Sequence, residues 1–96
     1  MEQQTDLLLS FDELIAASHS ERNWVLALIE EEVISVSGTP QQAEFSGFHL
    51  ARVRRAQRLS HDFEASVPAL GLIMRLLDEV EELRKNQRPL SLLDEQ

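Results

Sequence analysis

The side chains that most often carry out chemistry are present in this chain, but their spacing does not bring them together. The three histidines, His19, His49 and His61, lie far apart, and none belongs to an H-x-x-x-H or H-E-x-x-H pattern that would point two ligands at a metal. Ser60, His61 and Asp62 are the residue types of a hydrolase triad, but consecutive helical residues diverge by about 100° and cannot share one proton path. We therefore expect no metal site, no catalytic residues and no enzyme.

Nucleotide and thiol chemistry also lack support. No G-x-G-x-x-G or Walker sequence occurs, and the three glycines, Gly38, Gly47 and Gly71, are too scattered to cradle a phosphate. The chain has no cysteine, which excludes disulfides, thiolate catalysis and cysteine zinc sites, and which fits a reducing compartment. We expect no cofactor.

The size of the chain fits one domain. It has 96 residues, of which 43% are hydrophobic and 5% aromatic, so aliphatic side chains must form most of the core. No segment approaches the run of about 18 apolar residues that spans a bilayer, and the start of the chain, Met1 to Gln4, lacks the basic residues of a secretory signal. These features predict a cytoplasmic protein with no membrane partner.

The charge of the chain favours a protein partner over a nucleic acid. The formal net charge is −8, whereas nucleic-acid-binding modules are usually basic because each phosphate contact needs Arg or Lys. Within residues 1–34, Arg22 is the only cation against eight acids, so the amino-terminal third carries most of the acidity. A basic protein surface is the predicted partner. The eight acids are Glu2, Asp6, Asp12, Glu13, Glu21, Glu30, Glu31 and Glu32.

Two short helices are predicted in the same third. Ser10 and Glu13 have the spacing of a capping box, which predicts a helix ending about Ser18. Ser20 is the predicted N-cap of a second helix, which runs to about Glu32. The two helices would form a helix-turn-helix. The apolar residues that share a face along them are Phe11, Leu14, Ile15, Trp24, Val25, Leu28 and Ile29.

A small β-hairpin, or wing, is predicted after the second helix. Residues 33–36 are rich in β-branched side chains, residues 37–40 have turn chemistry, and residues 42–45 could return as a second strand. Ser46 then caps a third helix that ends near Asp62 or Phe63. The residues expected along its apolar side are Leu50, Val53, Ala56, Leu59 and Phe63.

Two features of these helices have more than one interpretation. The arginines of the third helix could contact phosphates, although they are more typical of a solvated face whose stems cover apolar surface. Trp24 is typical of a core residue, and a protein-binding hot spot is its alternative. The arginines are Arg52, Arg54, Arg55 and Arg58.

The last predicted helix is the longest, over residues 67–87. Ser66 caps it, Pro68 fits its first turn, and Pro89 is expected to end it. Because the helix is apolar almost all round at its start, one neighbouring surface cannot bury it. Leu70 and Leu77 are expected in the protein's own core. A short coiled-coil seam predicts a homodimer, with one side of a monomeric four-helix core as the alternative. The seam residues are Ile73, Leu76, Val80 and Leu83.

The predicted order of elements resembles the MerR-like winged helix-turn-helix domain, and within that superfamily the chain resembles the chaperone modulator family, CbpM. The fold expected from this resemblance is mainly α-helical, with four helices and a hairpin wing. The expected domain organisation is an N-terminal segment (1–9), a MerR-like helical domain (10–87) with its dimerisation helix (67–87), and a C-terminal tail (88–96). The motifs that carry the resemblance are Leu28 to Ile34, Arg55 to Phe63, Pro68 to Leu70, and Leu76 to Val80.

The resemblance implies a partner and a mechanism. Family members bind the J domain of a DnaJ-like, DNA-binding co-chaperone of the CbpA type and inhibit it, so we expect occlusion of the surface that docks on Hsp70. The alternative is a MerR-like DNA-binding transcription regulator. DNA binding is not expected, because the would-be recognition helix ends in three glutamates. From charge alone, the predicted partner-binding residues are Glu30, Glu31 and Glu32, followed by Asp78, Glu79 and Glu82. Many family members have a glycine near the end of the second helix, where this chain has Glu32.

Overall fold

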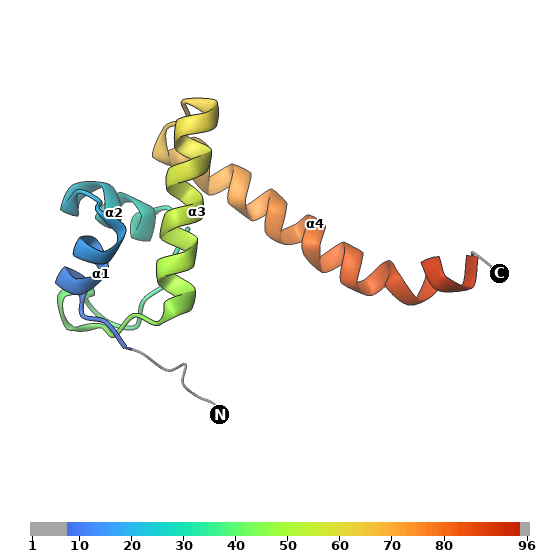
Figure 1. Cartoon of the computed structure of the whole chain (residues 1–96), viewed down its shortest axis with the longest axis horizontal. Helices are drawn as coiled ribbons and strands as arrows, with labels where there is room; N and C mark the ends of the chain where they lie inside the picture. Colours follow the sequence, from blue (N-terminus) through green and yellow to red (C-terminus); the bar gives the residue numbers. More distant parts are fainter. Residues whose placement is uncertain (1–7, 95–96) are drawn as a thin grey trace.

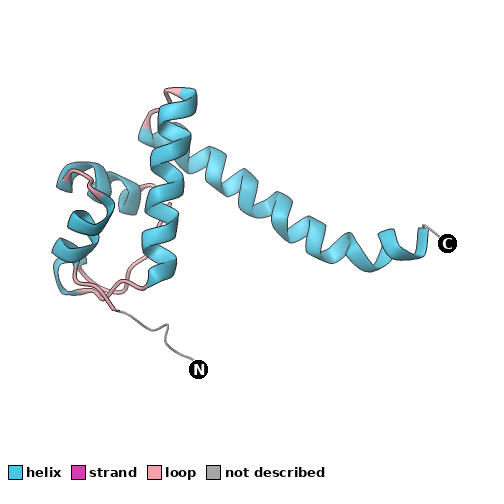
Figure 2. Cartoon of the chain, in the orientation of Figure 1, coloured by secondary structure: helices cyan, strands magenta, loops and turns pink. Residues whose placement is uncertain are grey.

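Four α-helices form the fold, as a computed structural model that describes residues 8–94 shows. In Figure 1, α1, α2 and α3 pack together with a long loop to form a lobe, residues 8–63, and α4 runs away from it. Figure 2 draws the described residues as helix and loop alone, so the predicted mainly α-helical class is confirmed. The elements are α1 (Phe11–Ser18), α2 (Arg22–Glu30), the 3-10 helix η1 (Pro40–Gln42), α3 (Gly47–Phe63) and α4 (Val67–Asp94).

Short-range capping starts three of the helices as predicted. At α1 the Glu13 amide donates to the Ser10 hydroxyl over 3.1 Å, and the Ser10 amide donates to the Glu13 carboxylate over 2.8 Å. Ser46 caps α3, and the Ser66 hydroxyl accepts a hydrogen bond from the Ala69 amide in the first turn of α4. Each contact satisfies a backbone donor that the first turn of a helix leaves unpaired.

The predicted cap of α2 is wrong. Glu21 occupies the N-cap position and makes no capping hydrogen bond with its side chain. The Ser20 hydroxyl instead accepts a hydrogen bond of 2.7 Å from the Gln57 amide on α3, and it lies 2.8 Å from the Ser18 hydroxyl. The Ser20 hydroxyl therefore links the turn between α1 and α2 to α3. It bonds to Gln57 of α3 and caps no backbone amide of α2.

The end of α2 shows how Glu32 takes the place of the glycine that is common at this position in the family. The Val33 amide donates to the Leu28 carbonyl and the Glu32 amide to the Ile29 carbonyl, over 2.9 and 3.0 Å, which is the Schellman pattern. The residue at the turn of this motif takes a left-handed conformation, and Glu32 does so with φ of 62°. The α-helix thus ends at Glu30, and Glu32 stands where glycine is usually found.

The structure does not contain the predicted hairpin wing. Val33 and Ile34 are both buried, whereas successive side chains of a strand point to opposite faces, so this segment cannot form one half of a solvated hairpin. Within residues 8–94 the one β-bridge pairs Phe45 with Leu9, through N···O distances of 2.7 and 2.8 Å. The two apolar ends of the loop, residues 33–34 and Phe45, are therefore part of the core of the lobe.

The core joins the lobe to the first turns of α4. Leu70 is fully buried, as predicted, but Met74 occupies the next core position of α4, and Leu77 is only half-buried. Phe63 is exposed, contrary to the predicted face of α3, and Trp24 is half-buried against the core. The buried apolar residues are Phe11, Leu14, Val25, Leu28, Val33, Ile34, Phe45, Val53, Ala56, Leu70 and Met74.

The backbone of α4 stays helical past Pro89 to Asp94, so the predicted end near residue 87 is wrong. Proline removes one amide donor and crowds the preceding turn, which can kink a helix without ending it. Most of the predicted tail, residues 88–96, is thus helical backbone, and its last two residues lie outside the described part, as do residues 1–7 of the predicted N-terminal segment. No helix within the described residues is long and apolar enough to cross a membrane.

Candidate partner-binding surface

The face of α2 that would read DNA in a helix-turn-helix is poorly equipped for phosphate. Arg22, the only cation of α2, forms an ion pair with Asp12 of α1. Its guanidinium carbon also lies 5.2 Å from the centre of the Phe11 ring, which anchors the side chain against α1. At the other end of α2, Glu30 is exposed to solvent. The positive charge of Arg22, which a phosphate would need, is therefore already paired with Asp12.

The three acids predicted as a cluster at the end of α2 differ in their exposure to solvent. Glu30 and Glu32 are exposed, whereas Glu31 is half-buried against Gly71 of α4. A Cβ atom at Gly71 would lie 3.3 Å from the Cβ of Glu31 and 3.4 Å from its carbonyl oxygen. Gly71 thus permits the close approach of α4 to the end of α2, and Glu31 contributes to this contact.

The fold brings Glu32 and Asp78, which are distant in sequence, to one small pocket. The pocket has a volume of about 100 Å³ and lies where the end of α2 meets α3 and α4. Two arginines, Arg52 and Arg75, line the same pocket as the two acids. The residues that line the pocket are Glu32, Val33, Arg52, Gly71, Met74, Arg75 and Asp78.

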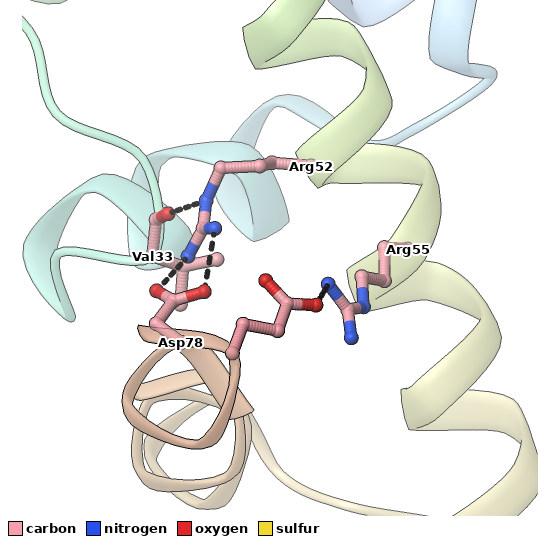
Figure 3. Close-up of polar contacts among 5 residues, drawn as sticks. Val33, Arg52, Arg55 and Asp78 are labelled. Carbon is pink, nitrogen blue, oxygen red and sulfur yellow. Dashed lines mark hydrogen bonds and ion pairs between the residues drawn. The ribbon is translucent and has the colours of Figure 1, made fainter. Parts of the chain in front are cut away.

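A clamp centred on Arg52 holds the pocket together, and sequence reasoning missed it. Figure 3 shows the guanidinium of Arg52 reaching from α3 to both oxygens of Asp78, over 3.2 and 3.1 Å, while its Nε donates to the Val33 carbonyl over 2.7 Å. One turn along each helix, Arg55 forms a longer ion pair of 3.5 Å with Glu81. The charge of Asp78 is therefore satisfied within the chain. The signal in the sequence was the matched spacing of arginines on one helix and acids on the other.

A groove between α3 and α4 extends from this clamp. It has a volume of about 420 Å³, and the side chain of Phe48 at its edge is 66% exposed. Glu82, one of the predicted partner-binding residues, lines the groove and lies 4.0 Å from Lys85. Glu79 is exposed on α4 and does not line the groove. The lining residues are Phe48, Ala51, Arg52, Arg55, Asp78, Glu81, Glu82 and Lys85.

The predicted seam of α4 forms an apolar stripe on the surface. Ile73 is half-buried, whereas Leu76, Val80 and Leu83 are 51%, 42% and 53% exposed. Leu72, beside the stripe, is 53% exposed. A single chain therefore leaves a row of large apolar side chains in contact with water, which often marks an interaction surface.

The histidines serve the fold in different ways. His49 accepts a hydrogen bond from the Ser46 amide at Nδ1, over 2.9 Å, and its Nε2 lies 3.1 Å from the Ser35 carbonyl. His19 and His61 line an open pocket beside Trp24. The Ser60 hydroxyl, part of the apparent triad, donates to the Ala65 carbonyl. Among the side chains that the structure describes, those of residues 8–86, no group of three or more acidic or histidine residues could hold a metal ion.

Comparison with known proteins agrees with this arrangement. The family described as MerR HTH family regulatory protein matches residues 9–91. The chaperone modulatory protein CbpM of Coxiella burnetii (strain Dugway 5J108-111) is 29% identical over 89 residues, which cover 92% of this chain and 84% of the relative. A protein of the same name from Pseudomonas entomophila (strain L48) is 30% identical over 63 residues, which cover 65% and 62% of the two chains. The resemblance noted in the sequence motifs is confirmed.

Proposed function

The chain belongs to the MerR HTH family of regulatory proteins, and on that premise we propose that it is a chaperone modulator that binds the J domain of a DnaJ-like co-chaperone of the CbpA type. The observation that carries this proposal is the similarity to chaperone modulatory proteins over 92% of the chain. Binding inhibits the co-chaperone because it covers the basic helix through which a J domain docks on Hsp70. The protein acts by occupying a surface and performs no chemistry.

The charge distribution supports a basic partner. Glu30 and Glu32 are exposed at the end of α2, and neither forms an ion pair within the described residues, so both are available to a cationic surface. Complementary charge of this kind raises the rate of association and disfavours wrong partners more than it raises affinity. We assign the first contact to Glu30, Glu31 and Glu32. Asp78, Glu79 and Glu82 form a second set, in which Asp78 acts through the clamp with Arg52.

The protein works as a homodimer in this proposal. The exposed stripe of α4 is the surface that a second copy covers, through Ile73, Leu76, Val80 and Leu83. The support is their exposure beside a core that already occupies the other side of the helix. Two heptads form a marginal coiled coil in water on their own, but α4 is held against the lobe by Leu70 and Met74.

Calorimetric titration of the full chain with the isolated J domain of the host co-chaperone tests the proposal. We expect saturable binding that weakens as salt is added, because part of the attraction is electrostatic. We also expect the Hsp70 chaperone to compete with this protein for the J domain. Absence of heat and of co-elution at high micromolar concentrations would remove the proposal.

A DNA-binding transcription regulator is the second candidate, favoured by the family match over residues 9–91. A mobility-shift assay with mixed duplex DNA at low salt separates the two. Few phosphates could be neutralised by α2, so we expect little binding. Tight binding with a steep dependence on salt would favour the regulator.

A further inference from the structure

We propose that the open pocket at the start of α2 holds an arginine side chain of the basic partner, with the guanidinium group between the ring of Trp24 and the carboxylate of Glu21. This inference rests on the proposed function and deepens it, because it names a binding pocket and the chemical group that the pocket takes. It gives Trp24, for which the sequence left two interpretations, the role of a contact residue.

Side chains from two helices line the pocket, which has a volume of about 400 Å³. Glu21 and Trp24 line it at the start of α2. Gln57 and Ser60 line it from α3. A volume of this size lies within the range of about 300 to 1,000 Å³ that is usual for sites that take small organic groups. The pocket can therefore accept the end of one long side chain.

Gln57 contributes an acceptor that has no donor. Its side-chain amide carries two hydrogens, and it donates one to the Ser18 carbonyl and the other to the Ser20 hydroxyl, each over 2.7 Å. Because a carbonyl oxygen can only accept, the contact with Ser18 fixes which end of the amide is the nitrogen. The other end is the oxygen Oε1, and no group among residues 8–86 donates a hydrogen bond to it.

Two more acceptors belong to the same pocket. The Ser60 hydroxyl donates its hydrogen to the Ala65 carbonyl over 3.1 Å, so only its lone pairs remain for a ligand. The carboxylate of Glu21 makes no capping hydrogen bond and no ion pair within residues 8–86. The other charged types in the lining, His19 and His61, are counted as neutral at pH 7. The pocket therefore carries the negative charge of Glu21.

A guanidinium group fits this set of side chains better than an ammonium group or an anion. A guanidinium is planar, so its face stacks on the ring of Trp24 while its edge donates to several acceptors. An ammonium group is compact and strongly hydrated, and it has no face to stack. An anion would meet the carboxylate of Glu21 and the unpaired oxygen of Gln57. The pocket therefore selects arginine.

The source of the arginine is the partner protein. The pocket is open to solvent, so a side chain that projects from another surface can enter it. Trp24 is half-buried and packs against the core, which holds its ring in place. Aromatic side chains that are held in this way often contribute most of the binding energy of an interface. The pocket thus adds an anchor at the start of α2 to the exposed acids Glu30 and Glu32 at its end.

Fluorine NMR tests the pocket directly, because the chain contains a single tryptophan. Labelling with 5-fluorotryptophan gives one resonance, which reports on Trp24 alone, and the unlabelled J domain adds none. We expect the resonance to shift during titration with the J domain and to stop shifting at the ratio at which calorimetric binding saturates. Calorimetric binding without any change in the resonance would overturn the inference and leave the proposed function standing. Absence of binding by both methods would remove the proposed function as well.

Variants of the pocket measure the strength of the contact. Glu21→Gln should weaken binding of the J domain about three- to tenfold at low salt, because the guanidinium loses its counter-charge. Glu44→Gln removes the same charge from an exposed site on the loop and should weaken binding less than about twofold. Trp24→Leu keeps an apolar side chain but removes the ring, so we expect a loss of about tenfold, and Trp24→Phe should lose less. Circular dichroism checks the fold of the Trp24 variants, and Glu21→Gln gives the answer if they do not fold. Equal affinities of Glu21→Gln and Glu44→Gln would overturn the inference.

The chemical group is tested on the partner. Each arginine of the J domain is changed to lysine in turn, which keeps the positive charge but removes the planar group. We expect one of these changes to weaken binding and to reduce the fluorine shift of Trp24. Combined with Trp24→Leu, the same change should cost little more, because the two residues act in one contact. If every lysine variant bound as tightly as the wild-type J domain, the occupant of the pocket would not be arginine and the inference would be wrong.

Discussion

The guanidinium of Arg52 donates hydrogen bonds to both carboxylate oxygens of Asp78, and its Nε donates to the carbonyl of Val33 (Figure 3). One side chain thereby joins the end of the α2 turn, α3 and α4. The side chain of Arg52 is only 16% exposed, so its charge is largely enclosed by these partners. The clamp therefore adds a polar contact between the lobe and α4, the helix that carries the apolar stripe.

We predict that Arg52→Ala lowers the free energy of unfolding by about 1 to 2 kcal/mol, because it leaves the Val33 carbonyl and Asp78 without their partner. Arg52→Lys should recover only part of the loss, since an ammonium group cannot form the fork. Arg58, exposed on the same helix, provides the control, and its change to Ala should alter stability by less than about 0.5 kcal/mol. Urea denaturation of the three variants measures these differences. Equal effects at Arg52 and Arg58 would contradict the clamp.

Glu32→Gly should stabilise the protein by about 0.5 to 1 kcal/mol, because Glu32 has a positive φ that glycine adopts without strain. Glu30→Gly is the matched control: it lies in the helical last turn and should destabilise by a similar amount. Thermal denaturation detects both. The same Glu32 variant should bind the J domain less tightly, so stability and affinity would change in opposite directions. A fall in stability would show that the Glu32 side chain makes a contact worth more than the strain.

The helix caps that the sequence predicted correctly depend on neighbours along the chain. The capping box of Ser10 and the hydroxyl cap of Ser46 act within three residues, and the structure confirms both. The prediction of a hairpin wing was wrong because Phe45 pairs with Leu9. This pairing depends on packing in the core, which strand propensity does not reveal. The clamp of Arg52 on Asp78 joins residues 26 positions apart, so no local pattern revealed it. The partner-binding assignments remain predictions.

His49 should prove important for the loop that replaces the wing. His49→Ala removes the acceptor for the Ser46 amide and the partner of the Ser35 carbonyl, so we expect a loss of about 1 to 2 kcal/mol in stability. His49→Gln can still reach back to the Ser46 amide, as glutamine does in a capping box, and should recover about half of that loss. Hydrogen exchange gives the local measurement. The Ser46 amide should exchange faster in the Ala variant than in the Gln variant, and equal rates would show that the ring is not its acceptor.

Leu76→Asp should convert the proposed dimer to a monomer, because it places a charge in the middle of the apolar stripe. Phe63→Asp is the control, since Phe63 is an exposed apolar residue on α3 outside the stripe. Light scattering at several concentrations measures the mass, and circular dichroism checks that both variants keep their helices. A dimer that survives Leu76→Asp would place the interface elsewhere.

Reversal of charge at the end of α2 tests the surface assigned to the J domain. Changing Glu30, Glu31 and Glu32 together to Lys should weaken binding by at least about tenfold at low salt, because a basic partner would then meet repulsion in place of attraction. The control changes three exposed acids elsewhere on the protein, Glu44, Asp62 and Glu64, to Lys and so shifts the net charge by the same amount. If attraction to the whole charge of the protein were the cause, both triple variants would bind equally poorly. A loss confined to the α2 variant, and smaller at high salt, would identify a local contact, whereas unchanged affinity would show that the J domain binds another face.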